Sequence, residues 1–359
     1  MTQTLNTVIT GTGSFIPSKV ISNAEFEQQA YFEKDQSLVE SPGEEISRKF
    51  REITGIYERR WADNNINNSD MASLAAHAAV ADAGIDPETI DQIIVANNFG
   101  NVKFGNHQTD MLPSIASRVK NALGIKNPSC IPYDIIFGCP GWVQGVIQAH
   151  SYIQSGMAKR CLVIGSETLS RVVDKYDRDT MIFSDGAGAT VVEGIMEDEK
   201  RGFLSYSFAS HTNEEVGYLY FGPSNAPDQN TDISYMKMLG RKIYEYSLTQ
   251  VPLAMKLSLE RSQIPIEDLK KILIHQANEK MDEAIVQRFY RQYHLKIDVQ
   301  EKMPMNIQTL GNSSVATVPT LYDMILKGKL ENHHISPGDV LMFASVGAGM
   351  NINSFVYRQ

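Results

Sequence analysis

Cys139 stands where a nucleophile would be useful, between Gly138 and the pair Pro140-Gly141, at the point where an extended run turns into a helix. The start of a helix presents unpaired N–H groups and the positive end of the helix dipole, which stabilise a thiolate and lower its pKa from about 8.5. The flanking glycines allow a tight elbow and let an acyl group come close to the backbone. Cys139 is therefore a candidate nucleophile.

Two further polar side chains are placed for chemistry. His275 directly follows the apolar run KILI, so it should emerge at the carboxyl end of a strand, where active sites of α/β proteins tend to lie. Asn312, in LGNSS before a helix, is either a helix cap or a functional amide. The glycine-rich loop ASVGAGMN, residues 344–351, is of a kind that turns bare backbone N–H groups toward a ligand oxygen.

The elements that must position these groups repeat within the chain. Residues 84–98 (GIDPETIDQIIVANN) and 263–278 (QIPIEDLKKILIHQAN) share a proline, an acidic turn, a short amphipathic helix and a buried strand ending in amides. A second pair, CPGWVQGVIQAHSYIQSG and GNSSVATVPTLYDMILKG, predicts two helices, each closed by a glycine (Gly156, Gly328) and followed by a strand. We infer a duplicated α/β fold with halves 1–200 and 201–359.

The duplication predicts that the three side chains converge on one site. If the halves pack about a pseudo-twofold axis, Cys139 and Asn312 occupy equivalent helix starts, and His275 points toward the same centre. Each residue alone has an ordinary structural explanation, because buried cysteines, histidines at strand ends and asparagine caps are common. The coincidence of all three at such positions favours an active site.

Composition limits the other possibilities. The chain has 359 residues, is 42% hydrophobic and carries a formal net charge of -9, which disfavours nucleic-acid binding. No apolar run approaches the roughly 18 residues that span a bilayer, and no signal peptide is evident. Three cysteines without such a signal indicate a reducing, cytoplasmic compartment, with Cys130 and Cys161 as buried small residues.

The glycine-rich stretches do not predict a cofactor. GTGSFI has Ile16 where a dinucleotide fingerprint needs its third glycine, and DGAGATVV leads into a strand instead of a helix. We therefore reject a dinucleotide site and expect neither a bound cofactor nor a metal.

Over essentially its whole length the chain resembles the ketoacyl synthase III type of condensing enzyme within the thiolase superfamily. The matching phrases are GTGSFIP, TGIYERR, the GCPGW around Cys139, SGMAKRCLVIGSE, DRDTMIFSDGAGA, HQAN, GNSS and the C-terminal glycine loop. The resemblance implies a duplicated five-layered αβαβα sandwich, normally a homodimer. It also implies the triad of Cys139, His275 and Asn312, with backbone N–H groups of Cys139 and Ala348 as an oxyanion hole.

The implied reaction begins with transfer of an acyl group from a coenzyme A or carrier-protein thioester to Cys139. His275 and Asn312 then bind the carbonyl of a malonyl extender while carbon dioxide leaves. The resemblance also implies docking of acidic acyl carrier protein on basic residues, and an acyl pocket closed by Met111 and Leu112 of the partner subunit. The candidate docking residues are Lys280, Arg241, Lys242, Arg48 and Lys49.

Several positions depart from the fatty-acid-priming members of the family. Lys49 and Ile53 stand where those enzymes place a Trp and an Arg against the coenzyme A adenine, and Pro140 follows the nucleophile. A specialised-pathway enzyme that joins two acyl thioesters into a cyclohexanedione or dialkylresorcinol ring is therefore the alternative at the level of substrate. An inactive partner-shaping subunit, and a hydrolase or transacylase that stops at the acyl-enzyme, are the alternatives at the level of reaction.

Overall fold

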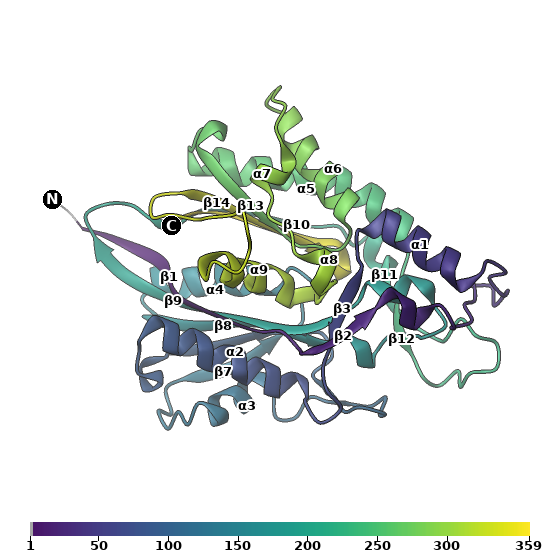
Figure 1. Cartoon of the computed structure of the whole chain (residues 1–359). Helices are drawn as coiled ribbons and strands as arrows, with labels where there is room; N and C mark the ends of the chain where they lie inside the picture. Colours follow the sequence, from purple (N-terminus) through teal and green to yellow (C-terminus); the bar gives the residue numbers. More distant parts are fainter. Residues whose placement is uncertain (1–2) are drawn as a thin grey trace.

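Two stacked sheets form the frame of the protein, for which a computed structural model describes residues 3–359 (Figure 1). The first sheet contains, in spatial order, β1 (Thr4–Phe15), β9 (Asp185–Glu197), β8 (Arg160–Thr168), β4 (Gln92–Ala96) and β7 (Ile131–Ile135). The second contains β10 (Gly202–Ser210), β15 (Asn351–Arg358), β14 (Val340–Gly347) and β13 (Leu269–Ile274).

The two sheets use the same strand arrangement. In the first, β4 is parallel to β8, β8 is antiparallel to β9, and β9 is antiparallel to β1. In the second, β13 is parallel to β14, β14 is antiparallel to β15, and β15 is antiparallel to β10. This correspondence confirms the predicted duplicated α/β fold. The sheet changes between Glu197 and Gly202, and we propose a division into halves 1–200 and 201–359 on that basis.

Strands buried on both faces explain the continuous apolar runs in the sequence. In β4, Ile93 and Val95 pack into one hydrophobic cluster, whereas Ile94 packs into the cluster on the opposite face. Because successive side chains of a strand point to opposite faces, a sheet covered on both sides needs apolar residues at every position.

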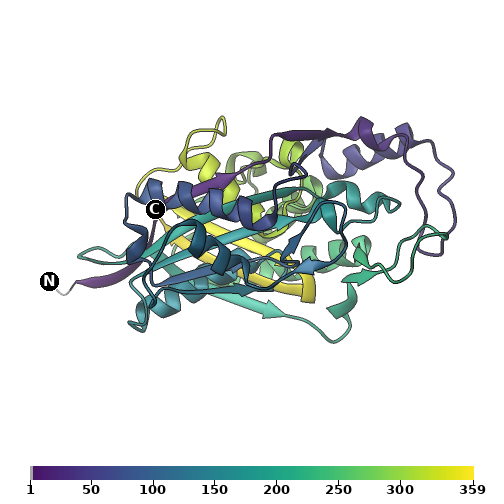
Figure 2. The same ribbon diagram turned by 90° about the horizontal axis from the view of Figure 1, so that it is seen from below.

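Helices cover and separate the sheets, giving five layers (Figures 1 and 2). The middle layer consists of α4 (Gly141–Gln154) and α9 (Thr317–Leu326), whose apolar side chains share one cluster with residues of both sheets. The outer layers consist of α2 (Asn68–Ala83) and α3 (Ile115–Ala122) on the first sheet, and α5 (Gly240–Ser262) and α6 (Glu279–Arg291) on the second.

Glycine ends both middle helices as predicted. Gly156 after α4 and Gly328 after α9 have left-handed φ angles of 76° and 65°, which glycine adopts without a Cβ clash. The short helices expected before β4 and β13 are instead single 3₁₀ turns, Pro87–Thr89 and Ile266–Asp268. Each turn is too short for an α-helical hydrogen-bond ladder, because the chain becomes extended immediately afterwards.

The remaining helices and strand pairs are short or lie outside the five layers. They are α1 (Gly43–Thr54), α7 (Val299–Lys302), α8 (Ile307–Leu310), and the strand pairs β2 (Lys19–Ser22) with β3 (Glu58–Trp61), β5 (Asn101–Val102) with β6 (Thr109–Asp110), and β11 (Leu219–Gly222) with β12 (Tyr235–Met238). Of these, α7 packs at the start of β13. Within residues 3–359, no helix is both long and apolar enough to cross a membrane.

Candidate active site

A cavity of about 460 Å³ lies at the start of α4 and the carboxyl ends of β13 and β14. Its lining includes Cys139, His275 and Asn312, together with Ala348 of the glycine loop. The four residues come from four separate segments, so the fold assembles them from positions far apart in the sequence. The cavity, which we call the catalytic cavity, thus contains the side chains that the sequence predicted to converge.

The backbone around Cys139 and the glycine loop are in unusually close contact. A Cβ on Gly347 would lie 2.4 Å from the Cys139 nitrogen, and one on Gly138 would lie 2.6 Å from the Ala348 nitrogen. Only glycine fits at these two positions, and Gly138 also has a left-handed φ of 67°. Within residues 3–359, neither the Cys139 nor the Ala348 N–H donates to a turn or loop carbonyl. These two donors are therefore candidates for binding an oxyanion.

The thiol of Cys139 does not have the lowered pKa that the helix start led us to expect. Burial raises its pKa to about 11, and the nearby Glu167 carboxyl acts in the same direction. A hydrogen bond from Ser314 opposes this increase. The N-cap of α4 is Pro140, so Cys139 lies one residue before the cap and two before the first helical residue, where the helix dipole acts more weakly. The resting side chain is therefore the neutral thiol.

His275 is a buried, neutral imidazole. It follows β13 directly, as predicted, and its backbone N–H donates to Ala344 on the neighbouring strand at 2.8 Å. Its Nδ1 lies 2.7 Å from the hydroxyl oxygen of Thr317. Burial lowers the pKa of His275 to about 4, so the ring is uncharged at neutral pH. A neutral ring matches the role of a hydrogen-bonding partner for a substrate carbonyl.

Asn312 is fixed by its backbone and by one side-chain oxygen. Its N–H donates to Ile182 at 2.9 Å, and its carbonyl accepts from Ser184 at 2.8 Å. Its Oδ1 accepts from the Ser314 N–H at 2.8 Å, so the amide oxygen is occupied. The amide has two N–H donors besides this oxygen, and Asn312 lines the catalytic cavity.

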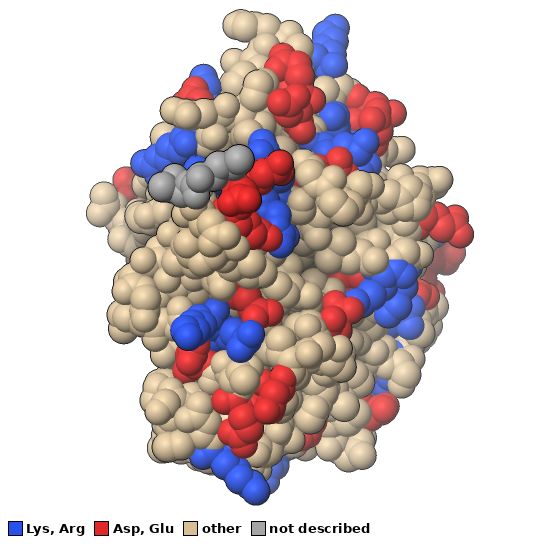
Figure 3. Space-filling view, turned by 90° about the vertical axis from the view of Figure 1, so that its left-hand side faces the viewer, with Lys and Arg blue, Asp and Glu red and all other residues tan. Residues whose placement is uncertain are grey.

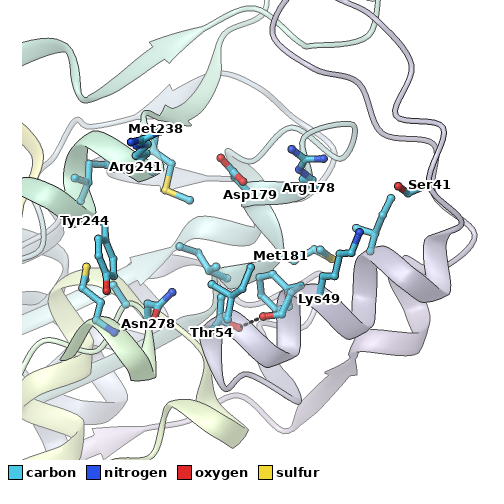
Figure 4. A pocket seen from close by; sticks show the side chains of 18 residues that line it. Ser41, Lys49, Thr54, Arg178, Asp179, Met181, Met238, Arg241, Tyr244 and Asn278 are labelled. Carbon is cyan, nitrogen blue, oxygen red and sulfur yellow. Dashed lines mark hydrogen bonds between the residues drawn. The ribbon is translucent and has the colours of Figure 1, made fainter. Parts of the chain in front are cut away.

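A second cavity, of about 640 Å³, shares part of its wall with the catalytic cavity; we call it the entrance cavity (Figure 4). The shared residues are Ile182, Met238, Ile243, Ala277 and Met281. Figure 4 shows Lys49 on α1, Arg178 and Asp179 on a 3₁₀ turn, and Arg241 at the start of α5 around this cavity. Three cations thus border an otherwise largely apolar approach to Cys139.

The other predicted carrier-binding residues are not part of the wall of the entrance cavity. Arg48, Lys242 and Lys280 are exposed but do not line it. Ion pairing does not separate the two sets, because Arg48 pairs with a glutamate of its own helix and so do Lys49 and Arg241. On the opposite end of the molecule, Figure 3 shows acidic and basic side chains interspersed without a continuous basic patch. The entrance cavity is therefore the stronger candidate for docking an acidic partner.

Met111 and Leu112 do not line the catalytic cavity of their own chain. Both are exposed, Leu112 to 87%, and they form part of a separate hollow beside β5 and β6. Such exposure of two large apolar side chains is compatible with the predicted contact to a second subunit.

Sequence reasoning missed four polar residues of this region: Arg178, Asp179, Ser314 and Thr317. Arg178 and Asp179 were visible only as part of DRDTMIFSDGAGA and Ser314 only as the last residue of GNSS, whereas Thr317 had no signal of its own. Cys130 and Cys161 are free and buried, as predicted. Within residues 3–359, no group of three or more His, Cys, Asp or Glu side chains is arranged to hold a metal ion.

Comparison with known proteins assigns the family. Residues 133–212 match the profile of 3-oxoacyl-[acyl-carrier-protein] synthase III, and residues 259–359 match the profile of its C-terminal region. The β-ketoacyl-[acyl-carrier-protein] synthase III of Staphylococcus haemolyticus is 32% identical over 99% of both chains. This chain belongs to the 3-oxoacyl-[acyl-carrier-protein] synthase III family. It is a condensing enzyme of the acyltransferase class.

Further relatives support the same family assignment and the same fold. The Staphylococcus epidermidis synthase III is 33% identical over 99% of both chains. The crystal structure of the Aquifex aeolicus synthase III has a TM-score of 0.78 and 29% identity, covering 99% of this chain and 100% of the other. The priming β-ketosynthase of the R1128 polyketide pathway has a TM-score of 0.80 at 22% identity, covering 100% and 97%, which shows a shared fold alone. These structures confirm the thiolase-type sandwich.

Proposed function

We propose that this synthase III family member catalyses a decarboxylating Claisen condensation between an acyl thioester and malonyl-acyl carrier protein, in fatty-acid or related biosynthesis. The observation that carries the proposal is the meeting of Cys139, His275 and Asn312 in one cavity beside the Ala348 loop. The synthase III names of its relatives, each similar over nearly the whole chain, support the same reaction.

In the first step, the Cys139 sulfur loses its proton and attacks the thioester carbonyl carbon. A new carbon–sulfur bond forms to Cys139, the bond to the donor sulfur breaks, and the donor thiolate takes up a proton. The N–H groups of Cys139 and Ala348 hold the negative oxygen of the tetrahedral intermediate. Donors fixed in advance favour the transition state, because they need no reorganisation when the charge appears.

In the second step, the thioester carbonyl of the malonyl group binds His275 and Asn312. The bond to the carboxylate carbon breaks, carbon dioxide leaves, and hydrogen bonds from the two side chains stabilise the negative enolate oxygen. The carbanion attacks the acyl carbon on Cys139, a carbon–carbon bond forms, and the Cys139 sulfur is released. The Asn312 amide suits this role because its oxygen is already occupied by the Ser314 N–H.

The entrance cavity supports a proposal for how carrier-bound substrates arrive. Lys49, Arg178 and Arg241 at its border would pair with the phosphate of a phosphopantetheine arm or with acidic residues of the carrier. Its shared wall with the catalytic cavity gives the thioester end of the arm a path to Cys139. The exposed Lys280, Lys242 and Arg48 would contribute at most to the outer docking surface.

Assembly and location complete the proposal. We expect a homodimer in which Met111 and Leu112 of each subunit close the acyl pocket of the other, because both side chains are exposed in the single chain. We expect the enzyme to act in the cytoplasm, where its carrier substrates and three unpaired thiols belong.

The test is intact-protein mass spectrometry with a panel of acyl-coenzyme A and acyl-carrier thioesters, followed by a malonyl-carrier chase. Wild type should gain an acyl adduct that the chase removes as a 3-oxoacyl product. Cys139→Ala should gain no adduct, whereas His275→Ala and Asn312→Ala should gain it but release little carbon dioxide. Normal condensation by Asn312→Ala would refute the assignment.

The same panel separates the alternatives. Discharge by 3-oxoacyl-carrier to a cyclic product would indicate the ring-forming pathway. Release of free acid or simple transfer without malonyl-carrier would indicate a hydrolase or transacylase, and no adduct from any thioester would indicate an inactive subunit. Lys49 and Ile53 both line the entrance cavity. We therefore expect these two residues to influence which acyl donor the enzyme accepts.

A further inference from the structure

A serine outside the predicted triad contacts the reactive sulfur. The hydroxyl of Ser314 donates a hydrogen bond to Sγ of Cys139 at 3.4 Å, a normal distance for a sulfur acceptor. A hydroxyl donor stabilises a thiolate much more than a thiol, because hydrogen bonds to charged acceptors are roughly twice as strong as neutral ones. The contact therefore acts mainly on the form of Cys139 that reacts.

The backbone of Ser314 is held in a costly conformation. Its φ is 53°, in the left-handed region that residues other than glycine rarely adopt. Its N–H donates to Oδ1 of Asn312, and the residue lies two positions after that amide. Backbone strain of this kind, of order 1–3 kcal/mol, persists where the surroundings impose it, often at functional sites. Here the strained backbone has two effects: it directs the Ser314 hydroxyl toward Cys139, and it places the Ser314 N–H where it fixes the Asn312 amide.

Asn98 connects Ser314 to the other side of the nucleophile. Its Nδ2 lies 3.3 Å from Oγ of Ser314 and 2.8 Å from Oε2 of Glu167, so both amide protons are used. Its Oδ1 accepts from the N–H of Gly138, the residue before Cys139. Because the Ser314 oxygen accepts a hydrogen bond from Asn98, its own hydroxyl proton is free to point at the sulfur. The Asn98 amide thus positions both the Ser314 hydroxyl and the Gly138 backbone next to Cys139.

Glu167 anchors Asn98 while remaining uncharged. It is fully buried on β8, and its Oε1 has no hydrogen-bond partner within residues 3–359. Burial, helped by the nearby Asp185 carboxyl, raises the pKa of Glu167 to about 8, so the acid is protonated at neutral pH. An ionised Glu167 would disfavour the Cys139 thiolate, whereas the neutral acid does not. Glu167 is the carboxyl whose charge acts on the Cys139 thiol, and the neutral His275 lines the same cavity as Cys139.

We propose that Ser314 is a further catalytic residue, which holds the Cys139 thiolate through a hydrogen bond from its hydroxyl, and that Asn98 and Glu167 are positioning residues for it. The proposal rests on the proposed function in one respect, because it takes Cys139 as the nucleophile. Ser314 keeps its proton throughout; no covalent step is added to the reaction.

The test measures the rate of Cys139 alkylation by iodoacetamide against pH, read by intact mass. Cys130 and Cys161 are fully buried, and Cys139→Ala gives the background. Ser314→Ala should react about tenfold more slowly at pH 7, as expected for loss of one charge-assisted hydrogen bond, and should converge with wild type at high pH. Ser314→Gly, which relieves the positive φ, should behave like Ser314→Ala. Profiles of both variants that coincide with wild type would overturn the proposal.

Matched variants separate the hydroxyl from general damage to the fold. Ser313→Ala alters the neighbouring serine and leaves the Ser314 donor of the hydrogen bond to the sulfur in place, so it should follow wild type. Asn98→Ala and Glu167→Ala should shift the profile in the same direction as Ser314→Ala, and Glu167→Gln, which keeps an acceptor for Asn98, should restore most of the rate. Failure of Glu167→Gln to restore the rate would exclude Glu167 as a positioning residue.

The alkylation assay needs no thioester, so its result is independent of the proposed function. A Ser314-dependent profile in a protein that no acyl donor labels would support the hydrogen bond and refute the condensation. Acyl transfer at wild-type rate by Ser314→Ala, with an unshifted alkylation profile, would refute the Ser314 proposal and leave the condensation standing.

Discussion

The hydroxyl of Thr317 links His275 to the backbone: its Oγ lies 2.7 Å from Nδ1 of His275 and 2.8 Å from the carbonyl oxygen of Ser314. A hydroxyl has one proton, so both contacts are hydrogen bonds only if Thr317 donates to the carbonyl and Nδ1 donates to Thr317. The resting imidazole then carries its proton on Nδ1 and a lone pair on Nε2. Donation from Nε2 to a malonyl carbonyl requires the Thr317 hydroxyl to turn toward Nδ1.

Thr317→Val should therefore impair decarboxylation more than acylation. The variant keeps the shape of the side chain but removes the hydroxyl that exchanges protons with Nδ1, and we expect carbon dioxide release to fall about tenfold. Adduct formation on Cys139 should change little, and Thr317→Ser should retain most activity. Release of carbon dioxide from malonyl-carrier and intact mass measure the two steps. Equal losses in both steps would contradict a role limited to His275.

Burial of neutral His275 should make stability depend on pH. Its pKa is about 4 in the folded chain and about 6.5 when exposed, so the unfolded chain binds the proton first as pH falls. The stability that the neutral ring confers is complete above pH 6.5 and is lost toward pH 4. Between pH 7 and 4.5, wild type should lose about 2–3 kcal/mol more than His275→Gln in urea unfolding. Parallel curves would contradict this burial effect.

Docking of the carrier should depend on the cations that border the entrance cavity. Arg178→Ala, Arg241→Ala and Lys49→Ala should each raise the KM for malonyl-carrier about five- to tenfold with little change in kcat. Lys242→Ala and Arg48→Ala are matched controls, because each removes an adjacent cation outside the cavity. Lys280→Glu should raise the KM only if the outer surface docks the carrier. Equal effects of Arg241→Ala and Lys242→Ala would place docking elsewhere.

The glycine loop should not tolerate even one added methyl group. In Gly347→Ala the new Cβ would lie 2.4 Å from the Cys139 nitrogen, so the loop must shift and the oxyanion donors must separate. Loss of one such donor typically costs 10²–10³ in kcat. Gly217→Ala, where the added Cβ meets no atom within 4 Å, is the control. Steady-state condensation rates, with circular dichroism to confirm folding, provide the measurement.

Local patterns were sufficient to predict the frame and the convergence of Cys139, His275 and Asn312 in one cavity, whereas their catalytic roles stay a prediction. The apolar runs and the turn residues before them identified β4 and β13 as equivalent strands, and Gly156 and Gly328 marked the ends of the middle helices. Cys139, His275 and Asn312 each stand at the end of such an element, so duplication alone brought them together. The prediction of a short α-helix before each of these strands was wrong, because three residues of helical propensity do not determine whether the turn is α-helical or 3₁₀.

The electrostatic properties of the site were beyond such patterns. The pKa of Cys139 depends on burial and on Glu167, which lies 28 residues away in sequence, and the sequence signals only the helix start. Ser314 and Thr317 act through hydrogen bonds whose partners are known only once α9 and β13 are packed. Likewise, exposed cations at the entrance cavity are indistinguishable in sequence from Lys242 beside them.

The shared middle layer has a consequence for folding. Side chains of α4 and α9 occupy a single hydrophobic cluster, and both sheets contribute to it. A fragment ending near residue 200 would expose Trp142, whose ring packs against Phe343 and Phe355 of the second sheet and which is 1% exposed in the whole chain. The two sequence repeats are thus not autonomous folding units: each half completes the interior of the other, and cooperative unfolding of the whole chain follows from that mutual dependence.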